Sequence, residues 1–351
     1  MHNNIPQNAR PVITNDHNED HVYVFEPQAV DAVNAALAIN RPLLIRGEPG
    51  AGKSQLAKAA AMALGRTFIP FAVNTATEVK DLLWSFDAVA RLADAQIEGA
   101  LCTPAERCAA RERLAVKNYI QPGPLWAALN WASAKAQYEQ LTACAQEACG
   151  VRENSLAHYL NADKALTNGV VLLIDEIDKA DSSVPNGLLE VLGSNRFQPE
   201  GLNQQVEAVG FRPLIILTTN EERVLPDAFI RRCLSVMLGL PKNHQAQLDY
   251  LLAHSRPNFQ ELDRLLPSQG KKAKTILEAA AAMILKDREI AEKSSLHPLP
   301  GQAEYFDLLR GIKELMADKS PDELTALIES LARFTSKKHP DFPEDPDQKS
   351  L

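Results

Sequence analysis

The segment GEPGAGKS, residues 47–54, combines residue types that suit the binding of a triphosphate. Its spacing is GxxxxGK[ST], in which glycines let backbone N–H groups approach phosphate oxygens at the start of a helix. The lysine of this pattern places a positive charge on the β and γ phosphates, and the serine hydroxyl is a magnesium ligand. The alternative is a glycine-rich turn that binds nothing. We expect ATP and Mg²⁺ to bind through Gly47, Glu48, Pro49, Gly50, Ala51, Gly52, Lys53, Ser54 and Gln55, with Ser54 on the metal.

Two adjacent acids follow the apolar run 170–174, in the sequence GVVLLIDEIDKA. Ligands of parallel α/β sheets bind at the carboxyl ends of strands, which is where Asp175 and Glu176 would lie. We expect Asp175 to be the second magnesium ligand and Glu176 to be the general base that polarises the attacking water. The alternative is that both acids only cap the following helix.

A third apolar run, 214–219, ends at Asn220, and LPDAFIRRC follows at 225–233. An amide beside the γ phosphate can orient water without adding charge, so Asn220 is a candidate catalytic residue. Arg231 and Arg232 end a short predicted helix. Paired arginines at the end of a helix are often only solvated charges or complements of the helix dipole. Because these two follow Asn220 closely, they are also candidates for an arginine finger that acts on the neighbouring subunit's nucleotide.

These segments must be held by a fold in which short apolar strands alternate with helices. That alternation, from about residue 22 to 240, is typical of a parallel sheet covered by helices on both faces, so the predicted fold class is α/β. The five expected strands are 43–46, 67–73, 170–175, 214–219 and 235–238.

The chain divides into regions of different character. Residues 1–21 are polar and are expected to be a disordered leader, 22–240 form the α/β domain, and 336–351 form a flexible tail. Within the α/β domain, about 87–168 reads as a helical insertion. The region 241–335 is helical throughout, and Ser320 with Glu323 forms a predicted capping box for its last helix.

Composition restricts the classes of function. The chain has 351 residues, 45% of them hydrophobic, and a net charge of -8. This acidic balance disfavours broad binding to nucleic acid. No apolar run approaches the length of a membrane span and no secretion signal is evident, so we expect a cytoplasmic protein.

Four of the five cysteines lie in the predicted insertion, at Cys102, Cys108, Cys144 and Cys149. A zinc site is one interpretation. Neither pair has CxxC spacing, and neither spacing puts both sulfurs on one helix face, so reduced and packed cysteines are favoured instead.

The motifs GEPGAGKS, LLIDEIDKA, LTTNEER and LPDAFIRRC, in this order, resemble the AAA+ ATPases and specifically their MoxR-like branch. Residues 81–92, 119–129 and 197–213 are similar to further segments of that branch, the last to its hairpin. The resemblance implies a P-loop α/β domain with a C-terminal helical lid, hexameric rings and ATP-driven remodelling of a protein client. A von Willebrand A-domain protein is an expected partner. By matching positions, Asp175 and Glu176 are the Walker B pair, Asn220 is the first sensor, and Arg232, or alternatively Arg231, is the finger.

Two departures from the family pattern stand out. Ala303 occupies a position where many members carry the second-sensor arginine, so another basic residue would have to couple the lid to nucleotide. The interval from Lys53 to Asp175 is also about twice the expected length, and we expect partner recognition in the addition.

The aromatic residues of the interval have two interpretations. Trp84 and Phe86 could project toward a pore or pack under the inserted helices. Trp126 and Trp131 are expected in the core.

The favoured function is an ATP-hydrolysing ring chaperone that acts on a protein. The alternative is a motor subunit that acts on DNA in a restriction-type or defence system, which a salt-dependent DNA affinity would favour. A GTP switch is disfavoured because no NKxD element is present, and Glu176 argues against a scaffold without turnover.

Overall fold

The computed structural model of the chain describes residues 4–14, 20–101, 103, 105–147, 156–160, 168–266, 274–317, 319–339 and 342. The chain forms two compact units. Unit 1 comprises Met1–Ala9, Phe25–Arg46 and Leu56–Val236, and unit 2 comprises Arg10–Val24, Gly47–Gln55 and Met237–Leu351. Within the described part of the chain, every helix is too short or too polar to cross a bilayer.

Unit 1 is built on a five-stranded parallel sheet, which confirms the predicted fold class. Its strands are β3 (Leu43–Arg46), β4 (Thr67–Ala72), β7 (Val170–Asp175), β10 (Leu214–Thr219) and β11 (Leu234–Met237). Three of the five match the predicted bounds, β4 ends one residue earlier than predicted, and β11 begins and ends one residue earlier than predicted. The spatial order is β11-β3-β10-β7-β4, so β10 lies between β3 and β7.

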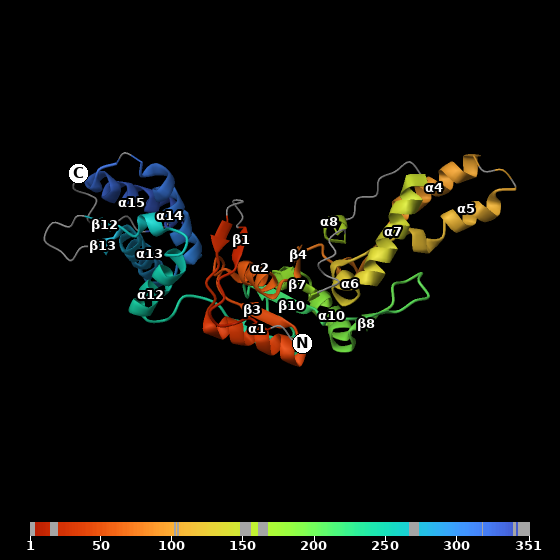
Figure 1. Cartoon of the computed structure of the whole chain (residues 1–351), viewed down its shortest axis with the longest axis horizontal. Helices are drawn as coiled ribbons and strands as arrows, with labels where there is room; N and C mark the ends of the chain where they lie inside the picture. Colours follow the sequence, from red (N-terminus) through yellow and green to blue (C-terminus); the bar gives the residue numbers. More distant parts are fainter. Residues whose placement is uncertain are drawn as a thin grey trace. The chain divides into compact units, whose positions relative to one another are not determined.

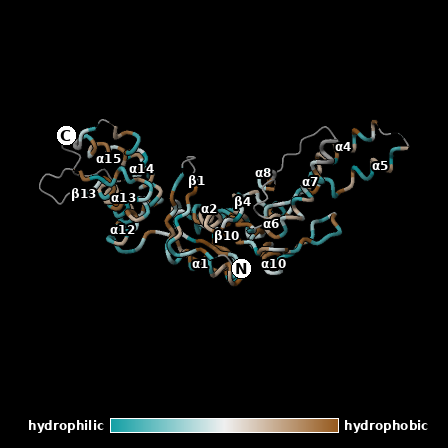
Figure 2. Tube along the Cα trace, viewed as in Figure 1, coloured by the Kyte–Doolittle hydropathy of each residue, from teal (hydrophilic) through white to brown (hydrophobic). Residues whose placement is uncertain are grey.

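The central strands are apolar because helices cover both of their faces. Every residue of β10 is buried, and so is every residue of β7 except Asp175. Brown, hydrophobic tube marks this part of unit 1 in Figure 2. The register pairs Arg46 with Thr219 and Ile174 with Leu217, so β3, β10 and β7 end at the same edge of the sheet.

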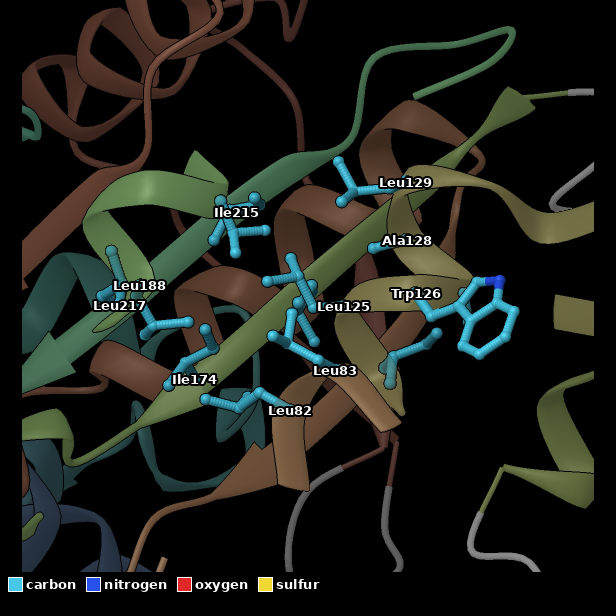
Figure 3. Packing of buried hydrophobic residues seen from close by; sticks show 14 of the residues in the cluster. Leu82, Leu83, Leu125, Trp126, Ala128, Leu129, Ile174, Leu188, Ile215 and Leu217 are labelled. Carbon is cyan, nitrogen blue, oxygen red and sulfur yellow. The ribbon is translucent and has the colours of Figure 1, made fainter. Parts of the chain in front are cut away.

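Several helices of unit 1 bury apolar residues against this sheet. In Figure 3, Leu125 and Leu83 lie against the strand that carries Ile174, with Ile215 and Leu217 on the next strand. The helical elements are α1 (Pro27–Ile39), α2 (Lys53–Leu64), which begins in unit 2, α3 (Val79–Leu83), α4 (Ala88–Leu101), α5 (Arg107–Arg113), η1 (Val116–Tyr119), α6 (Pro124–Leu129), α7 (Trp131–Glu147), α8 (Ala157–Leu160), η2 (Ile177–Lys179), α10 (Ser183–Ser194) and α11 (Asp227–Ile230).

The predicted insertion contains two structurally different parts. The strands β5 (Trp84–Phe86) and β6 (Ile120–Pro122) pair antiparallel and bring together the ends of the segment 87–119. Figure 1 shows α4 and α5 of this segment in orange, and an ion pair between Arg113 and Glu98 joins them. The following helices α6 and α7 instead contribute to the main core of unit 1. The segment enclosed by β5 and β6 is therefore the separate helical addition, which we call the β5–β6 insertion.

The aromatic side chains around the insertion take different places. Trp126 and Trp131 are buried in the core, as predicted. Trp84 packs against the same core from β5, whereas Phe86 is 38% exposed. Of these side chains, Phe86 is therefore the one presented to solvent.

Of the four cysteines that the sequence analysis singles out, the structure describes the side chain of Cys108. Cys108 is an exposed free thiol, which corrects the expectation that it is packed. Cys102 and Cys149 lie outside the described residues, as does the side chain of Cys144. Among the described residues no cluster of metal-ligating side chains is present.

The hairpin expected at 197–213 is present. Its strands are β8 (Arg196–Phe197) and β9 (Val206–Glu207), which pair antiparallel with Phe197 opposite Val206. Both of these apolar residues are buried in the core of unit 1. The loop between them, including Gly201, is therefore anchored at its base by the sheet domain.

Unit 2 is mainly helical and has its own apolar core, to which Leu251, Ile284 and Tyr305 contribute. A capping box between Thr275 and Glu278 begins its longest helix, and Ser320 forms the predicted box with Glu323. The elements are β1 (Val12–Thr14), β2 (Asp20–Val22), α12 (His244–Ser255), η3 (Gln260–Leu262), β12 (Leu265–Leu266), β13 (Lys274–Thr275), α13 (Ile276–Lys293), α14 (Gln302–Leu315) and α15 (Pro321–Thr335).

The described residues of the predicted leader 1–21 are ordered, which corrects the expected disorder there, whereas only residues 336–339 and 342 of the predicted tail are described. In unit 1, Ile5 is buried and its backbone N–H donates to Asn34. In unit 2, β1 and β2 form an antiparallel pair, and Asn258 bonds both backbone groups of Val22. Ser336 is also buried and donates to Asp287. Residues 1–3, 15–19, 340–341 and 343–351 lie outside the described residues.

Replacing Leu172 with alanine should destabilise the protein by about 2–5 kcal/mol, because this β7 side chain is fully buried in the core. Urea unfolding followed by circular dichroism measures the change. The matched control is Leu92→Ala on α4, which is 61% exposed and should cost less than about 0.5 kcal/mol. Equal effects of the two substitutions would contradict the described core.

Candidate functional site

The predicted phosphate loop follows β3 and has the backbone conformation that its glycines permit. Gly47, Gly50 and Gly52 have φ values of 147, 77 and 78°, all in the region that side chains disfavour. A Cβ at Gly47 would lie 2.0 Å from the carbonyl oxygen of Leu238. The glycine pattern is therefore required by close backbone packing as well as by the turn itself.

Lys53 is folded back over this loop. Its Nζ donates to the carbonyl oxygens of Gly47 and Glu48 at 2.8 and 2.9 Å, and the residue is only 7% exposed. Ser54 and Gln55 follow it in the first turn of α2. The ammonium group thus lies within the loop, where a bound phosphate would meet it, and the intervening residues Pro49 and Ala51 complete the turn.

The loop fits the phosphate groups of a nucleotide. A polyphosphate requires close approach to backbone N–H groups and a positive charge. The loop offers both: added side chains at Gly47 and Gly50 would clash, and the Lys53 ammonium group is buried. The Ser54 hydroxyl and the Asp175 carboxylate are hard oxygen donors of the kind that Mg²⁺ takes. The loop residues belong to unit 2 and the strand-end acids to unit 1.

In unit 1, Asp175 ends β7 and is fixed by a residue that the sequence did not single out. The Thr218 hydroxyl on the neighbouring β10 donates to Asp175 Oδ1 and accepts a hydrogen bond from the backbone N–H of Glu176 at 2.8 Å. Thr218 is fully buried. One hydroxyl therefore holds the carboxylate of Asp175 and the backbone of Glu176 at the end of the strand.

Glu176 occupies a left-handed backbone conformation, with φ at 59°, directly after β7. Its Oε1 accepts a hydrogen bond from the Asn220 amide at 3.0 Å, and its Oε2 forms an ion pair with Lys179 at 2.5 Å. The hydrogen bond from Lys179 to this carboxylate raises the pKa of Lys179. The structure thus brings together the predicted base and the predicted water-orienting amide.

Asp178 holds the segment that carries Asn220. Its buried Oδ2 accepts the backbone N–H groups of Asn220 and Glu222, at 3.2 and 3.0 Å. The acidic motif DEIDKA contains this residue and Lys179, but the sequence pattern assigns roles only to its first two acids. The signal available in the sequence was a third acid, two residues after the base.

Arg231 and Arg232 end α11 on the exposed surface of unit 1. Their backbone carbonyls accept hydrogen bonds from Arg41, and the Arg232 guanidinium donates to the Ala228 carbonyl at 3.1 Å. Within the described part of the chain no hydrogen bond or ion pair joins either arginine to Glu176. Both side chains are therefore presented outward rather than to the acids of their own chain.

The family of the chain follows from comparison with known proteins. Residues 43–240 match the family described as "ATPase family associated with various cellular activities (AAA)", and the chain belongs to this family. It is an AAA+ ATPase, with the nucleotide-binding fold of that family. No curated protein matches the sequence.

Solved structures resemble this chain at low sequence identity. A point mutant of Thermotoga maritima RuvB is 14% identical with a TM-score of 0.41, and the alignment covers 87% of this chain and 68% of that one. The Brucella abortus NtrX in complex with ATP is 13% identical with a TM-score of 0.43, covering 87% of this chain and 55% of that one. These likenesses concern the fold alone.

Thr218→Val should lower both stability and turnover, because it leaves the Glu176 N–H and the Asp175 carboxylate without their shared partner. The expected destabilisation is about 1–3 kcal/mol. Thr218→Ser is the matched control, since it keeps the hydroxyl and should retain most of the activity. Unfolding curves and ATPase assays measure the two effects, and a fully active valine variant would remove Thr218 from the site.

Proposed function

We propose that this protein is a magnesium-dependent ATPase of the MoxR-like branch that forms a ring and remodels a protein client. The observation that carries the catalytic part is the contact between the Asn220 amide and the Glu176 carboxylate at the end of β7. A base held next to a neutral hydrogen-bond donor suits the activation of water beside a phosphate. Asp175, one residue earlier, supplies the metal-binding carboxylate of the same motif.

The residues of the chain divide the work of phosphoryl transfer to water. Lys53 and the backbone N–H groups of the loop bind and orient the β and γ phosphates. Ser54 and Asp175 would hold Mg²⁺, which neutralises charge on the phosphate oxygens when bound. The Glu176 carboxylate accepts a proton from the attacking water, and the Asn220 amide orients that water.

The exposed arginines support a ring in which each protomer completes its neighbour's site. Guanidinium groups stabilise the charge of phosphoryl transfer when supplied in trans. Arg232 is the proposed finger and Arg231 the alternate, and their position on the surface after β10 and α11 is compatible with a neighbouring subunit's nucleotide. We propose a hexamer, by resemblance to the branch, for a protein that works in the cytoplasm.

The β5–β6 insertion is the proposed region of client recognition. It extends from a two-stranded base, and its helix α4 has no buried residue. Binding elements commonly sit on such additions to a rigid scaffold. The proposed client is a protein, with a von Willebrand A-domain protein as the candidate partner.

Glu176→Gln should reduce ATP turnover by about 10² to 10⁴-fold while nucleotide binding persists, because the amide cannot accept the proton. A phosphate-release assay and nucleotide titration measure the two quantities. Glu207→Gln, at an exposed residue of β9, is the matched control and should remain active. Normal hydrolysis by Glu176→Gln would remove it as the base.

Arg232→Ala should reduce turnover by about 10³-fold or more with little change in nucleotide affinity, because the finger acts on the transition state. Arg231→Ala, tested alongside, decides which of the two is the finger. Steady-state kinetics separate the effect on kcat from that on KM. If both variants hydrolyse ATP at the wild-type rate, the arginines are surface charges.

The client class can be tested by affinity capture with the Glu176→Gln variant in the presence of ATP. Co-purification of a specific protein that ADP releases would support the chaperone function, and the mass of the captured assembly would give the ring size. Salt-dependent capture of DNA in place of a protein would instead support the motor function. Wild-type protein with ADP is the control.

A further inference from the structure

The phosphate loop of this chain contains a carboxylate, Glu48, next to the proposed binding site of a polyanion. The repulsion between like charges grows as they come closer and as less water lies between them to screen it. The Glu48 side chain is 48% exposed, so solvent only partly screens it. An acid at this position needs a compensating charge if the loop is to hold phosphates.

Arg288 of α13 supplies that charge through two parallel hydrogen bonds. Its Nη1 donates to Glu48 Oε2 at 2.9 Å, and its Nη2 donates to Glu48 Oε1 at 2.8 Å. The Arg288 side chain is only 9% exposed. A bidentate pair of this kind fixes direction as well as charge, because both partners are planar.

Further contacts fix the guanidinium itself. Nη1 also donates to the carbonyl oxygen of Pro300 at 3.1 Å, and Nε pairs with Glu292 at 3.0 Å. Arg288 therefore joins three segments of unit 2: the phosphate loop, α13 and the turn before α14. Its position depends on the protein fold and not on the loop alone.

The start of α14 lies close to the phosphate loop. A Cβ at Gly50 would lie 2.8 Å from the Cβ of Ala303, so α14 approaches the loop backbone closely there. Ala303 is the position at which the sequence resemblance leads us to expect an arginine. In this chain the guanidinium that reaches the loop comes from Arg288 instead.

We propose that Arg288 is a positioning residue for nucleotide binding, which neutralises Glu48 and holds the phosphate loop in its binding conformation. The inference rests on the proposed phosphate-binding role of the loop. Arg288 acts through Glu48, so its loss should matter because it exposes an uncompensated negative charge. If Arg288 only stabilised the fold, the effect of its loss on nucleotide binding would not depend on the charge of Glu48.

The test compares Arg288→Met, Glu48→Gln and the double variant, all in the full chain carrying Glu176→Gln to prevent turnover. The probes are fluorescent ADP and ATP, titrated at low and high salt. Lys293→Met is the matched control, because Lys293 forms an exposed pair with Glu289 on the same helix. Thermal unfolding of each variant accompanies the titrations.

Arg288→Met should weaken nucleotide binding about tenfold, more for ATP than for ADP, and the loss should shrink at high salt. Adding Glu48→Gln to Arg288→Met removes the uncompensated negative charge, so the double variant should recover most of the affinity that Arg288→Met alone loses. The inference would be overturned if Arg288→Met bound nucleotide as tightly as Lys293→Met does. It would also be overturned if the double variant bound nucleotide no more tightly than Arg288→Met.

Lys53→Met distinguishes this inference from the proposed function on which it rests. If Lys53→Met abolishes binding while Arg288→Met has no effect, only the role of Arg288 is wrong. If Lys53→Met binds nucleotide as well as the unsubstituted loop does, the phosphate-binding role itself is wrong.

Discussion

The parallel pairing of β10 with β3 on one side and β7 on the other is the constraint on which the candidate site depends. The register aligns Leu217 with Ile174 and Thr219 with Arg46, so the three strands end together. Because strands in a parallel sheet point the same way, the polar residues that follow them leave from one edge. A register shift of one residue would also turn Thr218 away from Asp175.

Polar groups at this edge form hydrogen bonds with one another. Thr218 bonds the Asp175 carboxylate and the Glu176 backbone N–H, Asp178 accepts two backbone N–H groups of the following turn, and Asn220 donates to Glu176. Such a network keeps catalytic groups oriented because each lost partner leaves another group unsatisfied. The same logic applies in unit 2, where Arg288 satisfies Glu48 and the Pro300 carbonyl.

The sequence predicted the sheet well because its strands are short apolar runs with clear boundaries. It singled out Asn220 and Glu176 separately, and the structure brings the two side chains into contact because both follow strands of the same sheet. It missed Thr218, because threonine in a strand is ordinarily only a favourable strand former and its bonding depends on register. Arg288 lies 240 residues from Glu48, and no local pattern indicates such a contact. The predicted insertion wrongly included α6 and α7, which pack in the main core of unit 1. Helical periodicity shows that a segment is a helix but does not reveal which surface that helix covers.

In the proposed ring, Glu176 of one protomer works with an arginine of its neighbour. Mixing Glu176→Gln protein with Arg232→Ala protein tests this arrangement, since each variant lacks a different half of the shared site. We expect each variant alone to be inactive and mixed assemblies to regain ATP hydrolysis, at interfaces where an intact Glu176 meets an intact Arg232. If mixing restores no turnover although mass measurement shows that mixed assemblies form, the site is not shared in this way.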